Sequence, residues 1–226
     1  MNLAKIQEGI AGYKAWLQKL RSHPGLYKWE TQQQWQLHWD PAASDPAAMF
    51  DRCLQNSETR RLWQQDNWQP KRVLLEFWRF EPRTVLGMFD DLFNEKYEVE
   101  NRISRFIFGC DTLLADYKRA HPTSVENNHY HADYRAVALY LALQMPEQYA
   151  PYDFELFRSA LMRLGARDIP AVNDVGRYFK VLRTLHGFLL KDAGVEPALQ
   201  RHLIPHRHYQ GKSLLLAEDF VRYLAD

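Results

Sequence analysis

The chain has 226 residues, of which 46% are hydrophobic and 25% are charged, and its formal net charge at pH 7 is +1. This profile is typical of a soluble globular protein that is long enough for a substantial core. It excludes a chain-wide attraction to nucleic acid or membrane, so any basic surface must be local. Because the chain has no uninterrupted apolar run of membrane-spanning length and no signal-peptide layout, we expect a cytoplasmic protein without a membrane partner.

The first stretch carries apolar side chains at alternating steps of three and four over residues 3–20, which predicts an amphipathic helix. His23, Pro24 and Gly25 end it. We expect residues 1–25 to pack on a helical domain of residues 26–226. The alternative is that the apolar stripe forms an oligomer seam.

The next segment, LYKWETQQQWQLHWD, predicts a second helix. Ser44 is the expected N-cap of a third helix that runs to about Leu54, with Asp45 and Pro46 in its first turn. Further helices are expected to open at Pro70 and Pro82 and to cover residues 97–117, 154–164, 172–190 and 214–224, with a short one near Leu199.

The element around which the chain is organised is expected to be a buried helix over about residues 131–145. Its apolar side chains first recur at helical spacing and then cover almost the whole circumference, which indicates burial on most sides. Met145 ends the helix because it precedes Pro146. Since no alternating run is long enough for a sheet, the fold class is mainly α, a single multi-helix globular domain around this central helix.

Motifs for catalysis are weak. Gly211, Lys212 and Ser213 resemble the end of a P-loop, but the glycine required five positions earlier is replaced by His206. No nucleophile elbow, dinucleotide fingerprint or reactive-cysteine signature is present. We therefore expect a non-enzymatic chain with no catalytic residues and no cofactor of its own.

Two histidine groups suggest metal binding but lack the accompanying ligands. The first comprises His129 and His131 with Asp133, and the second lies at residues 202–208. Neither contains a cysteine pair or the HExxH motif, so capping and polar surface roles are favoured and no metal site is expected. Cys53 and Cys110 lie in apolar helical patterns and are expected to be buried free thiols.

The strongest local electrostatic feature is the segment of residues 197–217, which contains no Asp or Glu. Such a segment can contact phosphates, although a solvated connecting loop is equally consistent with it. Residues 60–72 form a second basic stretch with interleaved tryptophans, weakened by Glu58 and Asp66. The candidate DNA-binding residues are Arg60, Arg61, Lys71, Arg72, Arg201, Arg207, His208 and Lys212.

Aromatic residues make up 14% of the chain, and some of them are candidates for stacking on bases. A tryptophan in the basic stretch is more often part of a core than a base platform. Tyrosines that flank the central helix could equally tie helix ends together through buried hydroxyls. The base-stacking candidates are Trp63, Trp68, Tyr130, Tyr134, Tyr149, Tyr152 and Tyr209.

Several stretches, in order, resemble a known family: LYKWETQQQWQLHWD, AAMFDRCL, PKRVLLEF, FDDLFNEKYEVENRISRF, HADYRAVALYLALQMPEQYAPYDFELF and LLLAEDFVRYL. They are similar to the region ahead of the AAA+ motor in McrB-type proteins, the GTP-dependent subunits of restriction systems that cleave DNA carrying modified bases. The resemblance spans residues 26–224. The motor itself is missing from this chain, so GTP and Mg are expected only in that missing domain.

The resemblance implies a DNA-recognition domain that binds duplex DNA with a modified base, and base flipping into a ring-lined pocket is the mode of recognition expected for such a base. Its implied partners are the motor domain and the nuclease subunit of the same system. This hypothesis predicts a contiguous basic surface beside a ring-lined cavity. The alternative is a protein-interaction or regulatory module on an AAA+ motor, which predicts an exposed apolar patch and no coherent basic face. An enzyme acting on a small ligand would instead need titratable groups clustered in a pocket.

Overall fold

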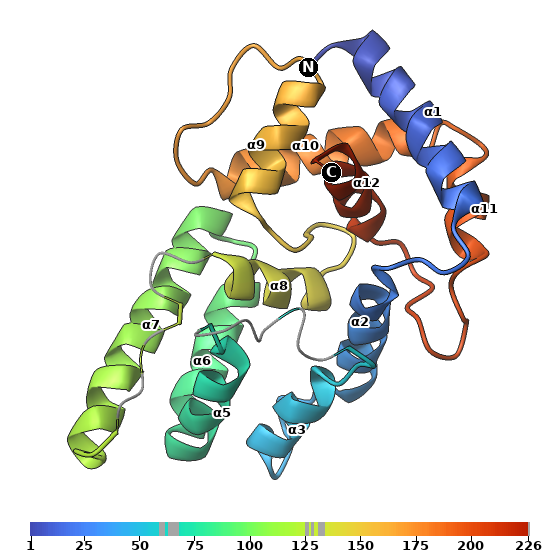
Figure 1. The fold of residues 1–226 in the computed structure, drawn as a ribbon. Coiled ribbons are helices and arrows are strands. Elements are labelled where there is room, and N and C mark those ends of the chain that lie inside the picture. The colour runs from blue at the N-terminus through green and yellow to red at the C-terminus, as the bar shows by residue number, and fades with distance from the viewer. Residues whose placement is uncertain (59–61, 63–67, 125–126, 128, 131–133, 226) are drawn as a thin grey trace.

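The structure, a computed structural model, describes residues 1–58, 62, 68–124, 127, 129–130 and 134–225. Within these ranges the chain is helical without a β-strand, which confirms the mainly α fold class (Figure 1). No helix in the same ranges combines the length and apolar character needed to cross a membrane. The helices are α1 (Leu3–Lys19), α2 (Leu26–His38), α3 (Pro46–Cys53), α5 (Pro70–Phe80), α6 (Pro82–Phe93), α7 (Val99–Ala120), α8 (Arg135–Gln144), α9 (Phe154–Arg163), α10 (Val175–Leu189), α11 (Val195–Gln200) and α12 (Leu215–Ala225).

The predicted central helix is confirmed as α8. Every residue from Ala136 to Leu143 is buried, and α2, α6 and α7 pack against this helix. Figure 1 shows α8 between a lower group of helices that includes α5, α6 and α7 and an upper group that includes α9, α10 and α12. Because each fully buried large apolar side chain contributes about 1.5–3 kcal/mol, the burial of α8 against α2, α6 and α7 makes a large contribution to the stability of the fold.

Much of the aromatic excess lies inside this core. The rings of Trp35 and Trp39 stack with their centroids 4.5 Å apart, and Trp35 also faces Tyr140 of α8. Trp78 stacks on Phe89 at a centroid distance of 5.8 Å. These rings fill the space between α2, α5, α6 and α8 and stabilise the fold. Trp35 and Trp78 are buried and present no face to a base, whereas Trp39 is half-buried.

The helix starts follow the local capping chemistry, with one correction. Asp45, rather than Ser44, is the N-cap of α3, because its Oδ1 accepts a hydrogen bond from the Ala48 N–H at 3.0 Å. Pro70 and Pro82 open α5 and α6 as predicted, each at a first-turn position that needs no amide donor. The apolar spacing and the charges near helix ends predicted the other helix boundaries to within a few residues.

Two long helices begin later than expected. Helix α7 starts at Val99, since the Tyr97 N–H still donates to the Asn94 carbonyl in the preceding turn. Helix α10 starts at Val175, because the side chain of Asp174 caps it by accepting from the Arg177 N–H at 3.0 Å. The apolar periodicity could not reveal the cap of α10, because this cap depends on a single polar side chain, that of Asp174.

The apolar stripe of α1 is buried within the chain. Ile6, Ile10, Tyr13 and Leu17 are buried, and α1 packs on α11 and α12. The stripe is therefore used for packing on the rest of the fold and is not available as an oligomer seam. Cys53 and Cys110 are confirmed as buried free thiols.

Candidate functional site

A buried polar cluster joins the two ends of the chain. Nε2 of His23, in the turn between α1 and α2, lies 2.9 Å from Asp219 Oδ2 on α12. The hydroxyl of Tyr13 donates to the same oxygen at 2.7 Å. Burial opposes ionisation of this carboxyl, but the hydrogen bond and charge of His23, with help from Lys28 and Tyr13, hold the pKa of Asp219 below its usual value.

The neighbouring residue on α12 belongs to a separate ion-pair group. Lys28 Nζ and the guanidinium of Arg222 donate to opposite oxygens of the Glu218 carboxylate. Glu218 and Asp219 thus face different partners, as expected for consecutive helix positions that point about 100° apart. Because each carboxylate is occupied by basic or hydroxyl partners, the two do not form an acid–base pair. Their role is to fix α12 against α1 and α2.

The acid-free segment of residues 197–217 wraps beside this cluster and is anchored to α2. The Tyr209 N–H donates to the Trp29 carbonyl at 3.0 Å. Arg207 donates to both oxygens of Glu30, at 3.1 and 3.3 Å, so its charge is neutralised by a carboxylate 177 residues away. Arg207 is therefore a weaker phosphate contact than the sequence suggested.

His208 is corrected from a DNA contact to an interior group. Its side chain is buried, and its Nδ1 accepts a hydrogen bond from the Ile204 N–H at 2.8 Å. Burial and the neighbouring positive charges of Arg207 and His206 lower the pKa of His208, with Glu30 acting in the opposite direction. A neutral, buried imidazole contributes no charge to a phosphate-binding surface.

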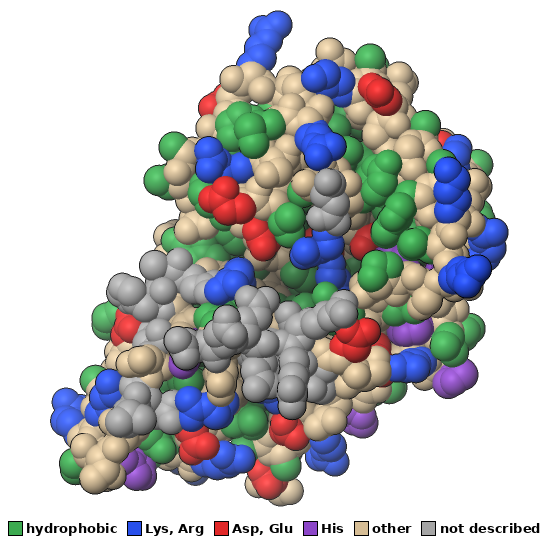
Figure 2. All heavy atoms as spheres, viewed as in Figure 1, with side chains coloured by type: hydrophobic (Ala, Val, Ile, Leu, Met, Phe, Trp, Pro, Cys, Tyr) green, Lys and Arg blue, Asp and Glu red, His purple; other side chains and the backbone are tan. Residues whose placement is uncertain are grey.

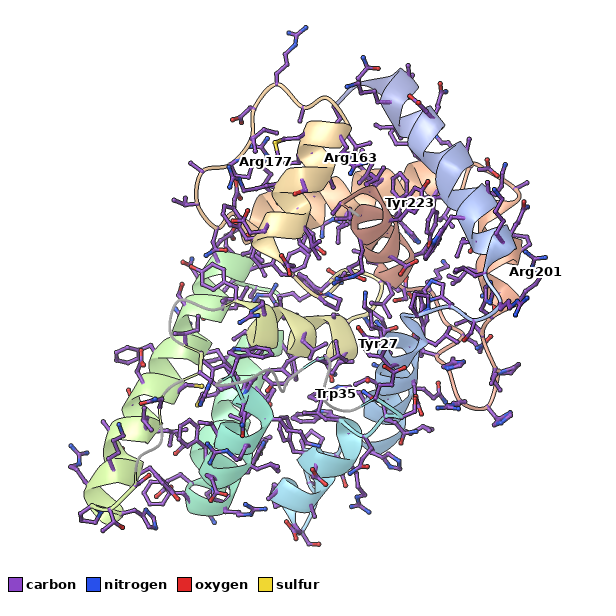
Figure 3. The ribbon with its side chains drawn as sticks, viewed as in Figure 1. Tyr27, Trp35, Arg163, Arg177, Arg201 and Tyr223 are labelled. Carbon is purple, nitrogen blue, oxygen red and sulfur yellow. The ribbon has the colours of Figure 1, made fainter. Side chains whose placement is uncertain are left out.

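The remaining basic residues of the segment are exposed. Arg201, His206 and Lys212 lie on the surface and form no ion pair with any residue that the structure describes. Figure 3 shows Arg201 at the outer margin of the molecule, beside α1 and α11. Arg201 and Lys212 are predicted contacts that the structure leaves open to a ligand, and His206 is an exposed residue of the same segment that the prediction did not include.

A second basic group adjoins them from the end of α1. His202 donates through Nε2 to the Leu17 carbonyl at 3.0 Å, which holds the segment against α1 just before Lys19 and Arg21. Lys19 and Arg21 are exposed, again without an ion pair within the described ranges. Figure 2 shows Lys and Arg side chains gathered along this margin of the molecule. We call this surface the basic edge, made of Lys19, Arg21, Arg201, His206 and Lys212.

The described basic residues of the other predicted stretch have partners of their own. Arg60, Arg61 and Trp63 lie outside the described residues. Lys71 is in an ion pair with Asp51 at 2.8 Å, and Arg72 donates to Gln69 Oε1 at 3.0 Å. The face of the Trp68 ring is covered by the guanidinium of Arg135, 4.2 Å from the ring centroid, and its Nε1–H donates to the His129 carbonyl.

The tyrosines that flank α8 follow the structural alternative. The hydroxyl of Tyr130 donates to the Pro70 carbonyl and accepts from Tyr140, while that of Tyr149 lies between Arg102 and Glu95. Tyr152 accepts from the Asp174 N–H. All three rings are buried, so none offers a stacking face to a base. Tyr134 and Tyr209 are half-buried.

A pocket of 310 Å³ lies beside the basic edge, between α10, α11, α12 and the acid-free segment. Its lining is mixed: Leu199, Leu203 and Leu216 are among its apolar residues, and its polar residues include His186, Glu196, Tyr209 and Lys212. Burial lowers the pKa of His186, opposed by the nearby Glu196 carboxylate, so the imidazole is neutral at neutral pH. The volume lies at the lower end of the range for small-molecule sites.

Nothing in the described ranges resembles a metal centre, because no group of three or more His, Cys, Asp or Glu side chains converges there. Of the first histidine group, His131 and Asp133 lie outside those ranges, while His129 Nδ1 accepts from the Gln69 N–H at 3.2 Å.

The chain matches no protein-family model, no curated protein and no solved structure.

Sequence reasoning missed Lys19 and Arg21, which complete the basic edge, and Glu30, which neutralises Arg207. Each depends on contacts between α1 or α2 and the last fifth of the chain. The exposed basic end of α1 was a visible signal, since Lys19 and Arg21 follow directly after the apolar stripe. No local pattern identifies which distant segment lies beside it.

Proposed function

We propose that this chain is a non-catalytic DNA-recognition domain of a McrB-type restriction subunit and that it contacts duplex DNA through the basic edge. The observation that carries the proposal is the set of exposed basic residues Lys19, Arg21, Arg201, His206 and Lys212, which form no ion pair within the described ranges. The hydrogen bond between His202 and the Leu17 carbonyl holds the segment that carries the last three against the end of α1, which is followed by the first two. Several other basic side chains, such as Lys14 and Arg177, are occupied by ion pairs. The family assignment comes from the sequence resemblance.

The chemistry suits phosphate contacts. Lys19, Arg21, Arg201 and Lys212 supply fixed positive charge, and His206 adds charge when it is protonated. Each phosphate contact releases counterions and contributes about 0.9 to the slope of log affinity against log salt. Four such contacts give a slope of about −3 to −4. With a net charge of +1, one isolated domain binds with modest affinity, and the motor ring of the parent system supplies avidity.

Of the four tyrosines expected to line a pocket for a flipped base, Tyr130, Tyr149 and Tyr152 are buried and Tyr134 is half-buried. The proposal therefore rests on phosphate contacts made by the basic edge. Recognition of a modified base is a further expectation from the family resemblance, and the motor domain and nuclease subunit would act on the DNA so recognised.

The alternative of a protein-interaction module predicted an exposed apolar patch, with the α1 stripe as one candidate for it. Ile6, Ile10 and Leu17 of that stripe are buried against other helices, so they cannot dock a partner. The described part of the chain exposes apolar residues elsewhere, such as Phe108 on α7. The DNA hypothesis is preferred because it predicted a basic surface, whereas the alternative predicted no coherent basic face.

The test is a binding titration with labelled duplexes that are unmodified, cytosine-methylated or adenine-methylated, at low and at moderate salt. We expect salt-dependent binding, and we expect Arg21→Ala and Arg201→Ala each to reduce the salt slope by about 1. Arg83→Ala, an exposed arginine on α6, is the matched control and should leave the slope unchanged. The absence of binding to every duplex at low salt would reject the proposal for this domain and favour the interaction module.

A further inference from the structure

We propose that the pocket beside the basic edge is a binding site for a small zwitterion with a large apolar body, such as a free amino acid with a leucine-like or aromatic side chain. The pocket combines several apolar side chains with one carboxylate and one ammonium group at its lining. This inference does not depend on DNA binding.

The apolar part of the lining matches an apolar side chain. Leu199, Leu203, Leu216 and Trp29 line the pocket and are buried in its walls. Leu190 lines the same pocket and is 45% exposed. Covering exposed apolar surface is favourable by about 25 cal/mol per Å² removed from water. A ligand side chain in this pocket would therefore gain binding free energy chiefly by covering Leu190.

The two charged groups of the pocket lining form no ion pair within the described part of the chain, so both can bind a ligand. Glu196 in the first turn of α11 and Lys212 in the acid-free segment both line the pocket and are exposed. Neither forms an ion pair with any residue in the described ranges, and they do not pair with each other. A ligand ammonium can bind the Glu196 carboxylate while a ligand carboxylate binds the Lys212 ammonium. Charge-assisted hydrogen bonds of this kind are about twice as strong as neutral ones.

The charge arrangement disfavours a simple anion. A nucleotide phosphate would be attracted by Lys212 but repelled by Glu196 across the same small pocket. His186 does not offset this repulsion, because burial keeps its imidazole neutral at neutral pH. The neutral ring can instead donate or accept a hydrogen bond. A ligand that carries both charges satisfies both rim groups at once.

Isothermal titration calorimetry should be made on the full chain with L-phenylalanine, L-leucine and L-tryptophan at neutral pH. Three controls each lack one feature: phenylalaninamide has no carboxylate, N-acetylphenylalanine has no ammonium, and glycine has no apolar body. We expect binding of at least one of the three amino acids, with affinity at least about tenfold weaker for each control compound. Nucleoside monophosphates are titrated in the same way, to test whether the pocket prefers an anion.

Glu196→Gln and Lys212→Gln should each weaken amino-acid binding by at least about tenfold, because each removes one charge-assisted contact. The matched controls are Glu8→Gln on α1 and Lys118→Gln on α7, which change the same charges on exposed helix surfaces away from the pocket. Binding that is unaffected by both pocket variants would overturn the site, as would binding of nucleotides without amino acids, or no binding at all.

Because Lys212 also belongs to the basic edge, Glu196→Gln separates the two proposals. It should weaken amino-acid binding by at least about tenfold and leave DNA affinity undiminished. Arg201→Ala should reduce the salt slope of DNA binding and leave amino-acid binding unchanged. Failure of the DNA titration therefore leaves the pocket open to its own test, and failure of the calorimetry leaves the basic edge unaffected.

Discussion

His23 and Asp219 are 196 residues apart in sequence, yet Nε2 of the imidazole lies 2.9 Å from the Oδ2 atom of the carboxylate in the protein interior. The Gly25 N–H donates to the other ring nitrogen, Nδ1, at 3.0 Å. Nδ1 is thus an acceptor, so the ring donates through Nε2 to Asp219. The hydroxyl of Tyr13 donates to the same carboxylate, so these hydrogen bonds hold α1, the turn after it and α12 together.

Replacement of this carboxylate should strongly destabilise the fold. Asp219→Ala leaves the buried donors of His23 and Tyr13 without an acceptor, and each buried donor left unsatisfied costs about 1–3 kcal/mol. Urea unfolding followed by circular dichroism measures the loss. Asp90→Ala, at an exposed position on α6, is the control and should change the unfolding free energy by less than about 0.5 kcal/mol. A similar small change for Asp219→Ala would contradict the assigned role.

The buried imidazole of His208 predicts a specific pH dependence. Burial, Arg207 and His206 lower its pKa, whereas Glu30 acts in the opposite direction. The unfolded chain therefore binds a proton that the native state does not, below an unfolded pKa of about 6.5. Stability should fall as the pH decreases through this value towards the lower folded pKa.

His208→Asn should flatten that decline, because asparagine does not titrate. The measurement is the urea midpoint from about pH 7.5 to 5. The flattening will be partial, since burial also lowers the pKa of His186, which contributes with the same sign. An unchanged slope in His208→Asn would show that this imidazole does not titrate differently in the two states.

The fold was predictable where its information is local. The residues of α8 are apolar around the whole helix. Pro70 and Pro82 mark helix starts because proline favours the first turn of a helix whatever its surroundings. Asp45 replaced Ser44 as the cap of α3 because both residue types suit that position and only the backbone path decides between them. Short-range physics thus gave the elements to within a few residues.

The candidate site was only partly predictable, because its electrostatics are set by long-range contacts. The acid-free composition of residues 197–217 predicted a basic surface, but Glu30 reaches Arg207 from α2 and neutralises it. The carbonyl of Leu17 holds His202 beside the basic end of α1, across 185 positions. Neither pairing can be predicted from the spacing of charges along one segment.

Two glycines should respond to alanine in opposite directions. Gly165 follows α9 with φ of 63°, and its N–H and that of Ala166 donate back to the last turn of the helix. Alanine in this left-handed conformation should cost about 1–2 kcal/mol. Gly87 lies within α6, and a Cβ added there meets nothing within 4 Å. Gly87→Ala should therefore stabilise the protein by up to about 1 kcal/mol. Thermal unfolding of both variants tests the pair, and the same sign for both would contradict it.

The two cysteines should be inert in the native protein. Burial raises the pKa of Cys53 to about 12, only partly offset by Arg52, and raises the pKa of Cys110 as well, with Asp111 adding to the effect. Since the thiolate is the reactive form, neither thiol should react with Ellman's reagent at about pH 8 until the protein unfolds.

The comparison for this test is Ser22→Cys, which places a thiol at an exposed position in the turn after α1. We expect this variant to react at once with a single equivalent in the native state, whereas both natural thiols become reactive in denaturant. Their native labelling rate should follow the opening of the fold, because each thiol must first be exposed. It should therefore increase in Asp219→Ala if that variant opens more often. Native labelling of Cys53 or Cys110 as fast as that of Ser22→Cys would show that the core around α3 or α7 is accessible to solvent.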